Sequence, residues 1–187
     1  MNIGILNIQG DVSEHYLMIK KLSKKLNVNP VAVNNKNTLA NLEGLIIPGG
    51  ESTVIFKFII QNDIYDRIIE MANEGMGIMG TCAGAIILSK NTNDTRVNGM
   101  NLINMGIKRN AYGRQINSFI QNIEIKNIGN FDAVFIRAPE IENVRDADVL
   151  AEYNNNPVVV KNNKKNKNVI AMTFHPELTG NTKIHEF

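Results

Sequence analysis

The stretch "GIMGTCAGAII", residues 77–87, indicates the fold class, because it passes from a strand pattern to a helix pattern through a turn of small residues. Met76 to Met79 is a short apolar run typical of a buried strand, and Ala83 to Leu88 continues as a helix. Between them, Gly80-Thr81-Cys82-Ala83-Gly84 matches the G-x-nucleophile-x-G turn that joins a strand to a helix, with cysteine in place of serine. Such a turn strains the backbone at the nucleophile, and larger side chains at the flanking positions would collide with neighbouring elements.

The alternation of strands and helices extends along the first two thirds of the chain. Ile3 to Ile8 is an apolar strand candidate, and the apolar residues from Val12 to Leu26 follow helical spacing. Further strands are expected at Val31 to Val33 and Leu45 to Ile47, and helices at Thr53 to Ile60 and Ile64 to Met71. Strands that alternate with helices predict a mostly parallel sheet that binds ligands at the carboxyl ends of its strands.

After about residue 118 the helical pattern weakens and strand candidates dominate. They are Ile120 to Ile125, Ala133 to Ile136, Val149 to Tyr153, Pro157 to Val160 and Val169 to Phe174. These runs predict an antiparallel extension of the same sheet. The polar stretch "KNNKKNKN", residues 161–168, is expected to form a solvated hairpin tip. The predicted fold class is α/β, a flavodoxin-like three-layer sandwich with a mostly parallel central sheet and an antiparallel extension.

Composition narrows the function classes. With 187 residues, 43% of them apolar and 20% charged, the chain is expected to form one domain over residues 1–187. A net charge of +2 gives no support to nucleic-acid binding, and no apolar run is long enough to span a membrane. The N-terminus lacks a secretory pattern, so a cytoplasmic location is expected. Because the chain has a single cysteine, no intrachain disulfide is possible.

That single cysteine, Cys82, is a candidate nucleophile. The N-terminal dipole and free N–H groups of the following helix would favour its thiolate form. Considered alone, a lone cysteine in an apolar segment can equally be inert packing.

"FHPE", residues 174–177, supplies the groups that a thiolate needs for acyl transfer. Directly after the last strand candidate, His175 would act as the base and Glu177 would orient it. Considered alone, His175 would be a structural histidine and Glu177 a surface carboxylate. His15 and His185 have no comparable setting, and we expect them to be surface or helix residues.

The stretch "PGGEST", residues 48–53, lies at another expected strand end. The N–H of Gly50 could face a developing oxyanion, with the Ala83 N–H as the second donor. The alternative, compatible with the first, is a simple turn before a helix capped by Ser52 or Thr53, with Glu51 in its first turn.

Together, these motifs resemble those of class I (triad) glutamine amidotransferases. "LNIQGDVSEH", "PGGEST", "GTCAGAIIL", "RNAYGRQ" at 109–115, "FIRAP" at 135–139 and "HPELT" at 175–179 are similar to the glutaminase subunits of pyridoxal 5′-phosphate synthases. The similarity runs nearly end to end, although the chain stops at "TKIHEF" where family members usually continue through a longer helix.

The resemblance implies hydrolysis of L-glutamine to glutamate and ammonia, without a metal or an organic cofactor. The ammonia would pass to a separate (β/α)8-barrel synthase subunit in a large hetero-oligomer. By correspondence of motifs, glutamine would contact six residues: Gly50, Glu51, Ser52, Arg109, Ile136 and Arg137. Two alternatives are the glutaminase subunit of another complex, such as the one that makes imidazole glycerol phosphate, and a catalytically silent binding subunit of the same fold.

The opening "NIQGD" suggests how docking of a partner could control the glutaminase activity. In a flavodoxin-like sheet, Gln9 and Gly10 would emerge beside the Gly49-Gly50 turn. We expect docking of the synthase subunit to let Gln9 hold that turn in its active orientation. The alternative is a plain turn, with Asp11 capping the first helix.

Overall fold

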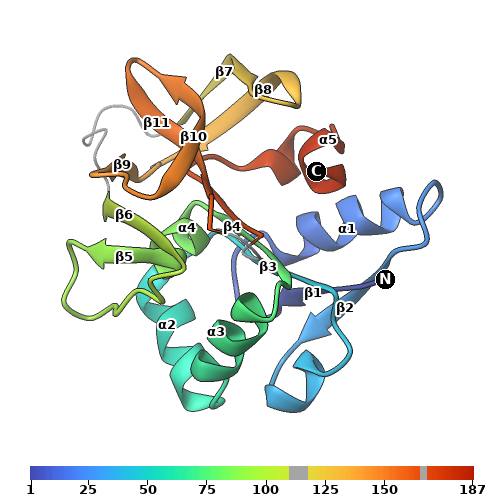
Figure 1. Ribbon diagram of the computed structural model, residues 1–187. Coiled ribbons are helices and arrows are strands. Elements are labelled where there is room, and N and C mark those ends of the chain that lie inside the picture. The colour runs from blue at the N-terminus through green and yellow to red at the C-terminus, as the bar shows by residue number, and fades with distance from the viewer. Residues whose placement is uncertain (110–117, 165–167) are drawn as a thin grey trace.

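The protein is described by a computed structural model that covers residues 1–109, 118–164 and 168–187 (Figure 1). Its centre is a seven-stranded sheet in the order β10-β11-β12-β4-β3-β1-β2. The bounds of these strands are β1 Asn2–Leu6, β2 Asn29–Val33, β3 Gly44–Ile47, β4 Gly77–Thr81, β10 Ala147–Tyr153, β11 Asn156–Asn162 and β12 Val169–Met172.

The parallel part of the sheet has the flavodoxin-like order. Strands β2, β1, β3, β4 and β12 pair in parallel, and β11 and β10 then extend the sheet in antiparallel orientation. The fold class is therefore confirmed, as is the expected neighbourhood of the first strand and Leu45 to Ile47. Because the parallel strands share one direction, their carboxyl ends meet at one edge of the sheet.

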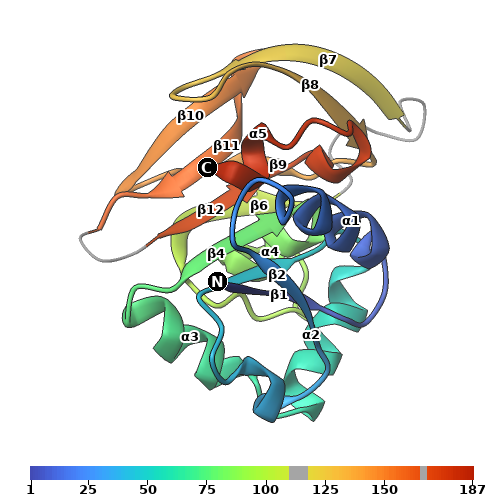
Figure 2. The ribbon, with the colours of Figure 1, turned by 90° about the vertical axis from the view of Figure 1, so that its right-hand side faces the viewer.

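The helices cover the two faces of the sheet (Figures 1 and 2). Their bounds are α1 Val12–Leu22, α2 Ser52–Gln61, α3 Tyr65–Asn73, α4 Ala83–Leu88 and α5 Lys183–Glu186, with short 3₁₀ helices η1 Lys36–Leu39 and η2 Pro176–Leu178. Figure 2 shows α5 beside α1. None of the helices in the described ranges is long and apolar enough to cross a membrane.

Two apolar clusters form the core, one on each face. In β1, for example, Ile5 packs into the cluster that holds α1, whereas the next residue, Leu6, packs into the cluster that holds α2, α3 and α4. Ile46 and Ile47 divide in the same way in β3. This two-sided burial explains why the parallel strands read as continuous apolar runs in the sequence.

The prediction for the second half of the chain was wrong in one respect. Strands β7 (Ser118–Ile125) and β8 (Gly129–Ile136) form a separate antiparallel hairpin instead of joining the central sheet. One face of this hairpin is buried and the other is exposed, because Phe119, Ile123 and Phe135 pack onto the α1-side cluster. Such an alternating pattern favours a hairpin lying on the core over a strand covered on both sides.

A second small sheet was not predicted. It consists of β5 (Ser89–Thr92), β6 (Ile103–Lys108) and β9 (Glu140–Glu142), in the order β5-β6-β9. The expected hairpin tip falls between the antiparallel strands β11 and β12, although its residues 165–167 lie outside the described ranges.

Candidate active site

Cys82 lies where β4 ends and α4 begins, at the carboxyl edge of the sheet. Its backbone adopts φ 48° and ψ −104°, a conformation that is costly for a residue with a side chain. The Cys82 N–H donates a hydrogen bond of 2.9 Å to the carbonyl of Met172, which ties the turn to β12. The strained turn predicted at the nucleophile's position is therefore present.

The turn also needs the small residue that follows it. A Cβ added at Gly84 would lie 2.0 Å from the carbonyl oxygen of Ile47, far inside contact distance. The close approach of α4 to β3 therefore excludes any side chain at this position. It fixes the start of α4, and with it Cys82, against the sheet.

His175 follows β12 directly before η2, and Glu177 lies within η2. Both are almost fully buried, with exposed fractions of 4% and 5%. His175 Nδ1 lies 2.9 Å from Glu177 Oε1. Because this carboxylate occupies Nδ1, the other ring nitrogen is left for the Cys82 thiol, which also forms a hydrogen bond with His175.

Asp11 contacts the same histidine, and sequence reasoning missed it. Its Oδ2 atom lies 2.9 Å from His175 Nδ1, so two carboxylates share one ring nitrogen. Asp11 does precede α1, but its side chain forms no capping hydrogen bond, so the capping interpretation was wrong. Acidic residues before a helix usually cap it, and only the position of β1 beside β3 brings this one to the pocket.

These contacts shift the ionisation of the three groups. Burial lowers the pKa of His175, but hydrogen bonds to Asp11, Cys82 and Glu177 outweigh it and raise that pKa far above 6.5. Burial raises the pKa of Glu177, whereas the hydrogen bond to His175 lowers the pKa of Asp11. The contacts of His175 therefore favour its protonated form.

Asp11, His175 and Glu177 are also the only group of described residues whose ligand-type atoms gather closely, within 4.8 Å of one another. Both carboxylates already lie 2.9 Å from one imidazole nitrogen. The group is therefore one imidazole nitrogen shared by two carboxylates.

A pocket of about 440 Å³ opens over Cys82, a volume in the range of small-molecule sites. Its lining brings together residues from six separate segments. Among them are nearly all of the predicted site residues: Gly10, Gly50, Glu51, Ser52, Cys82, Ala83, Arg109, Ile136, Arg137 and His175. Glu177 lies behind His175, and Gln9 is not part of the lining.

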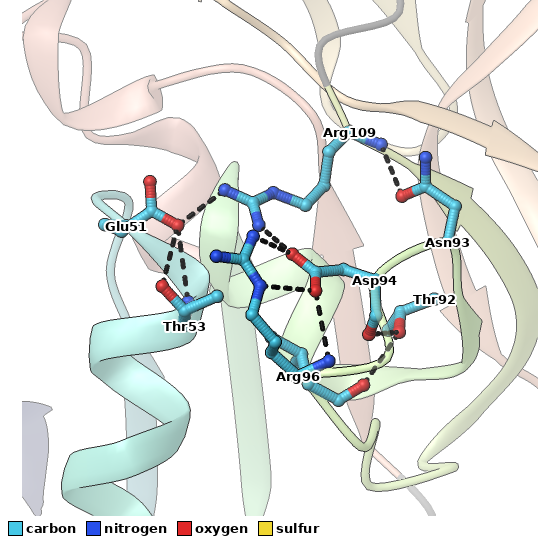
Figure 3. A network of polar contacts seen from close by, with 8 residues as sticks. Glu51, Thr53, Thr92, Asn93, Asp94, Arg96 and Arg109 are labelled. Carbon is cyan, nitrogen blue, oxygen red and sulfur yellow. Dashed lines mark hydrogen bonds and ion pairs between the residues drawn. The ribbon is translucent and has the colours of Figure 1, made fainter.

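Arg109 is anchored by two carboxylates at one wall of the pocket (Figure 3). Its Nη2 atom lies 2.5 Å from Glu51 Oε1, and its Nη1 atom forms an ion pair with Asp94. Asp94 in turn holds Arg96 at 2.7 Å. The remainder of the motif "RNAYGRQ", from residue 110 on, lies outside the described residues.

Glu51 also caps α2. Its side chain accepts hydrogen bonds from the N–H of Thr53 at 3.4 Å and from the Thr53 hydroxyl at 3.1 Å. The cap is therefore Glu51, and the expectation of Ser52 or Thr53 was wrong. Burial raises the pKa of Glu51, but the contacts with Thr53 and Arg109 outweigh it and lower the pKa overall. The carboxylate at the pocket wall is therefore ionised.

Ile136 and Arg137 reach the pocket from the end of β8. Both side chains are exposed, and Arg137 has a positive φ of 43°. Its guanidinium forms no ion pair with any residue in the described ranges, which distinguishes it from Arg109.

Gln9 and Gly10 lie against the turn that follows β3. Gln9 Nε2 donates a hydrogen bond of 3.3 Å to the carbonyl of Glu51. A Cβ added at Gly10 would lie 2.0 Å from the carbonyl oxygen of Gly49, so the two turns are in direct contact. The expected neighbourhood of these segments is confirmed.

Comparison with known proteins places the chain in a family. The model of the "SNO glutamine amidotransferase family" matches residues 5–187. The chain is 52% identical to "Pyridoxal 5'-phosphate synthase subunit PdxT" of Thermoplasma volcanium, over 100% of this chain and 92% of that protein. It is 53% identical to the protein of the same name from Picrophilus torridus, over 100% and 96% of the two chains.

Solved structures agree with this assignment. A "glutamine amidotransferase" crystal structure superposes with a TM-score of 0.88 at 37% identity, covering 98% of this chain and 95% of that chain. The PurLQS structure from Thermotoga maritima, with a TM-score of 0.71 at 16% identity over 97% and 92% of the two chains, shares the fold. With a family model that matches nearly its whole length, and with relatives more than half identical to it, the chain belongs to the SNO glutamine amidotransferase family.

Proposed function

We propose that the chain hydrolyses L-glutamine to L-glutamate and ammonia, and that the ammonia serves the synthesis of pyridoxal 5′-phosphate. One observation carries the proposal: Cys82 in its strained turn and His175, backed by the buried Glu177, open on one pocket. The names of the relatives support the choice of pathway. We propose further that residues 1–187 act as a single glutaminase domain in the cytoplasm.

The reaction begins with the Cys82 thiolate and the protonated His175. The thiolate attacks the side-chain amide carbon of glutamine, and the C=O electron pair moves onto oxygen to form a tetrahedral oxyanion. His175 then gives its proton to the amide nitrogen, which leaves as ammonia, and a γ-glutamyl thioester remains on Cys82. Water, deprotonated by the now neutral His175, attacks the thioester carbon, and the C–S bond breaks. The glutamic acid formed leaves as glutamate after losing its proton, and Cys82 returns as the thiolate beside the protonated His175.

The N–H groups of Gly50 and Ala83 are assigned to the oxyanion. Both residues line the pocket beside Cys82, and Ala83 directly follows the nucleophile. Removing one donor of this kind costs other enzymes roughly 3 kcal/mol in transition-state stabilisation.

The Glu51–Arg109 pair is the binding site that we assign to the backbone end of glutamine. A free amino acid carries an ammonium and a carboxylate side by side, so it can insert between the two side chains and exchange one ion pair for two. Asp94 keeps its own ion pair with Arg109 and holds the guanidinium in place. Ser52, Ile136 and Arg137 complete the proposed contacts.

The proposed partner is a (β/α)8-barrel synthase subunit in a large hetero-oligomer. Gln9 and Gly10 are the residues through which we expect docking to reach the oxyanion site, because they touch the Gly49-Gly50 turn and the Glu51 carbonyl. If so, Gln9→Ala still binds the partner but loses most of the partner's activation of glutaminase activity. Unchanged activation would reject this coupling.

The function is tested by measuring ammonia and glutamate release from L-glutamine, with and without the synthase subunit. Cys82→Ala should fold normally and release neither product. With glutamine labelled with ¹⁵N at its amide, the label should enter pyridoxal 5′-phosphate only when wild-type chain and synthase are both present. Incorporation that is equal with Cys82→Ala would overturn the proposal.

A further inference from the structure

A second histidine lies behind the triad, on the side of Glu177 that faces away from His175. His15, on α1, is fully buried. Its Nε2 atom lies 3.3 Å from Glu177 Oε2 and 3.2 Å from the hydroxyl oxygen of Thr81. Oε2 is buried and has no aligned hydrogen bond among the described residues, so the nitrogen of His15 is positioned to supply the missing donor. His15 was expected to be a surface or helix residue; it lies on helix α1, but with its side chain buried.

His15 is itself held by the third histidine of the chain. Its Nδ1 atom lies 3.0 Å from His185 Nε2, a contact that joins α1 to the C-terminal helix α5. Burial lowers the pKa of both rings, that of His185 to about 4 and that of His15 well below 6.5. Each ring is therefore neutral near pH 7 and has one N–H to donate.

The contacts select one arrangement of these two protons. If His185 donates from Nε2 to His15 Nδ1, then His15 carries its own proton on Nε2, where it faces Glu177 and Thr81. In the opposite arrangement, a lone pair of His15 would face the Glu177 carboxylate, and His185 Nδ1, which has no hydrogen-bond partner among the described residues, would become a buried unsatisfied donor. An unsatisfied buried N–H is costly, so the first arrangement is favoured.

We propose that His15 is a positioning residue of the triad: it donates its Nε2–H to Glu177 Oε2, and His185 fixes the tautomer in which it can do so. The chain of contacts then runs from His185 through His15 and Glu177 to His175. The role in catalysis rests on the proposed glutaminase function, but the tautomers follow from the contacts alone.

Glu177 needs such a hydrogen-bond donor because Asp11 competes with it for His175. His175 Nδ1 lies 2.9 Å from both Asp11 Oδ2 and Glu177 Oε1, so the ring has two carboxylates to choose from. Burial raises the pKa of Glu177, and a protonated Glu177 would be the weaker acceptor. Hydrogen bonds to a carboxylate favour its charged form, so donation by His15 keeps Glu177 ionised and His175 aligned with it.

The first experiment is ¹⁵N NMR of the full-length chain labelled at histidine. There are only three histidines, so Gln variants of each assign the six ring nitrogens directly. The expected result at pH 7 is a neutral Nε2–H tautomer for both His15 and His185. An Nδ1–H tautomer or a cationic ring at His15 would overturn the proposal, and this outcome does not depend on enzymatic activity.

The second experiment is a double-mutant cycle read out as kcat and KM for glutamine hydrolysis. His15→Leu should lower kcat about tenfold with KM within about twofold of wild type. His15→Gln keeps an amide N–H at the position of Nε2 and should recover most of the lost activity. Met18→Leu, at a buried position on the same helix, is the control for repacking and should match wild type.

The cycle separates positioning from a merely structural role. When Glu177 is already replaced by Gln, His15→Leu should cost less than about twofold, because the carboxylate through which it acts is gone. Equal losses in both backgrounds, or a His15→Gln variant no better than His15→Leu, would overturn the proposal. A wild-type chain without glutaminase activity would instead reject the proposed function, and the NMR result would still decide the tautomers.

The pH profile gives an independent readout. Glu177 is faced by His175 and Asp11 on one side and by His15 on the other, and His15 is faced by Thr81 and His185. Loss of the His15 donor leaves Glu177 easier to protonate, so the acid limb of kcat/KM should move to higher pH in His15→Leu. An acid limb that does not move would contradict the proposal.

Discussion

The reactivity of the pocket depends, at the scale of single residues, on where His175 keeps its proton. Its Nδ1 atom contacts two carboxylates. In the proposed mechanism, the other ring nitrogen therefore exchanges the proton with the thiol, the leaving amide nitrogen and water. Burial alone would lower the pKa of His175, but its hydrogen bonds, two of them to carboxylates, outweigh burial and raise that pKa, so the ring is cationic in the resting state. Each proton transfer in the proposed mechanism then takes place across a single hydrogen bond.

Replacing the two triad partners of Cys82 should therefore have unequal effects. His175→Asn removes both the general base and the general acid and should lower kcat by about a thousandfold or more. Glu177→Gln keeps a hydrogen-bond acceptor on Nδ1 and should lower kcat by only about ten- to a hundredfold. Steady-state kinetics of the two purified variants test this, and negligible losses in both would mean that the triad is misassigned.

Arg109 should control binding more than chemistry. Arg109→Gln removes a charged partner of the substrate carboxylate, a contact worth roughly 2 kcal/mol, and should raise KM about thirtyfold with a smaller change in kcat. Arg96→Gln is the matched control, because Arg96 binds the same Asp94 but does not line the pocket. Equal changes in KM for the two variants would assign the carboxylate elsewhere, with Arg137 as the next candidate.

The turn between β4 and α4 is the element that positions Cys82, the proposed nucleophile. Its geometry rests on the close approach of α4 to β3, where the backbone of Gly84 packs on the Ile47 carbonyl. The energy that holds Cys82 in a strained conformation therefore comes from packing on the α2-side core, where Ala85, Ile87 and Leu88 are fully buried.

Gly84→Ala should destabilise the protein by about 3 kcal/mol or more, because its Cβ would overlap the Ile47 carbonyl and backbone cannot move away cheaply. Gly77→Ala is the control in the preceding strand: its Cβ would meet no atom within 4 Å, and its φ is not positive. We expect its free energy of unfolding in urea to stay within about 1 kcal/mol of wild type. Equal stabilities would show that the turn tolerates a side chain.

Some of these elements could be predicted from the sequence, and some of the contacts between them could not. The parallel strands and the Cys82 turn were predictable, because continuous apolar runs and a fixed spacing of small residues are local signals. His15 and Asp11 were not. His15 fits the pattern of a helix in sequence, whereas its partners Thr81 and His185 lie 66 and 170 residues away. Only the order of the strands and the docking of α5 bring such groups together.

The hairpin β7–β8 was misplaced for a related reason. Its alternating pattern predicts one buried face, but it does not say whether that face meets the edge strand of a sheet or the top of a core. The stacking of Phe119 on Phe135, with ring centroids 4.7 Å apart, is a feature of the hairpin itself and could not be inferred from the spacing of either residue.

The protonation of His185, a partly buried residue, links the stability of the whole molecule to pH. The folded-state pKa of His185 is about 4, against 6.5 as the ordinary value, so below pH 6.5 the unfolded chain binds more protons at this residue. Stability from this group is therefore present above pH 6.5 and is lost as the pH falls toward 4. A difference of this size corresponds to about 3 kcal/mol at most.

His185→Gln should lose less stability on acidification than wild type, because glutamine does not titrate. The free energy of unfolding of both proteins is measured in urea at pH 7.5 and at pH 4.5. Lys183→Gln, on the exposed side of the same helix, is the control and should follow wild type. Parallel losses in all three proteins would show that His185 is not the group responsible.

In the proposed reaction, the Cys82 thiol carries the acyl group of glutamine. Intact-mass measurement after treatment with a glutamine-like diazo-ketone amino acid tests this. The electrophile should add once to the wild-type chain, at Cys82, and glutamine should slow the addition by competing for the pocket. Cys82→Ala, which should fold normally, should remain unlabelled. Addition to Cys82→Ala at a comparable rate, or wild-type labelling that glutamine does not slow, would contradict the claim.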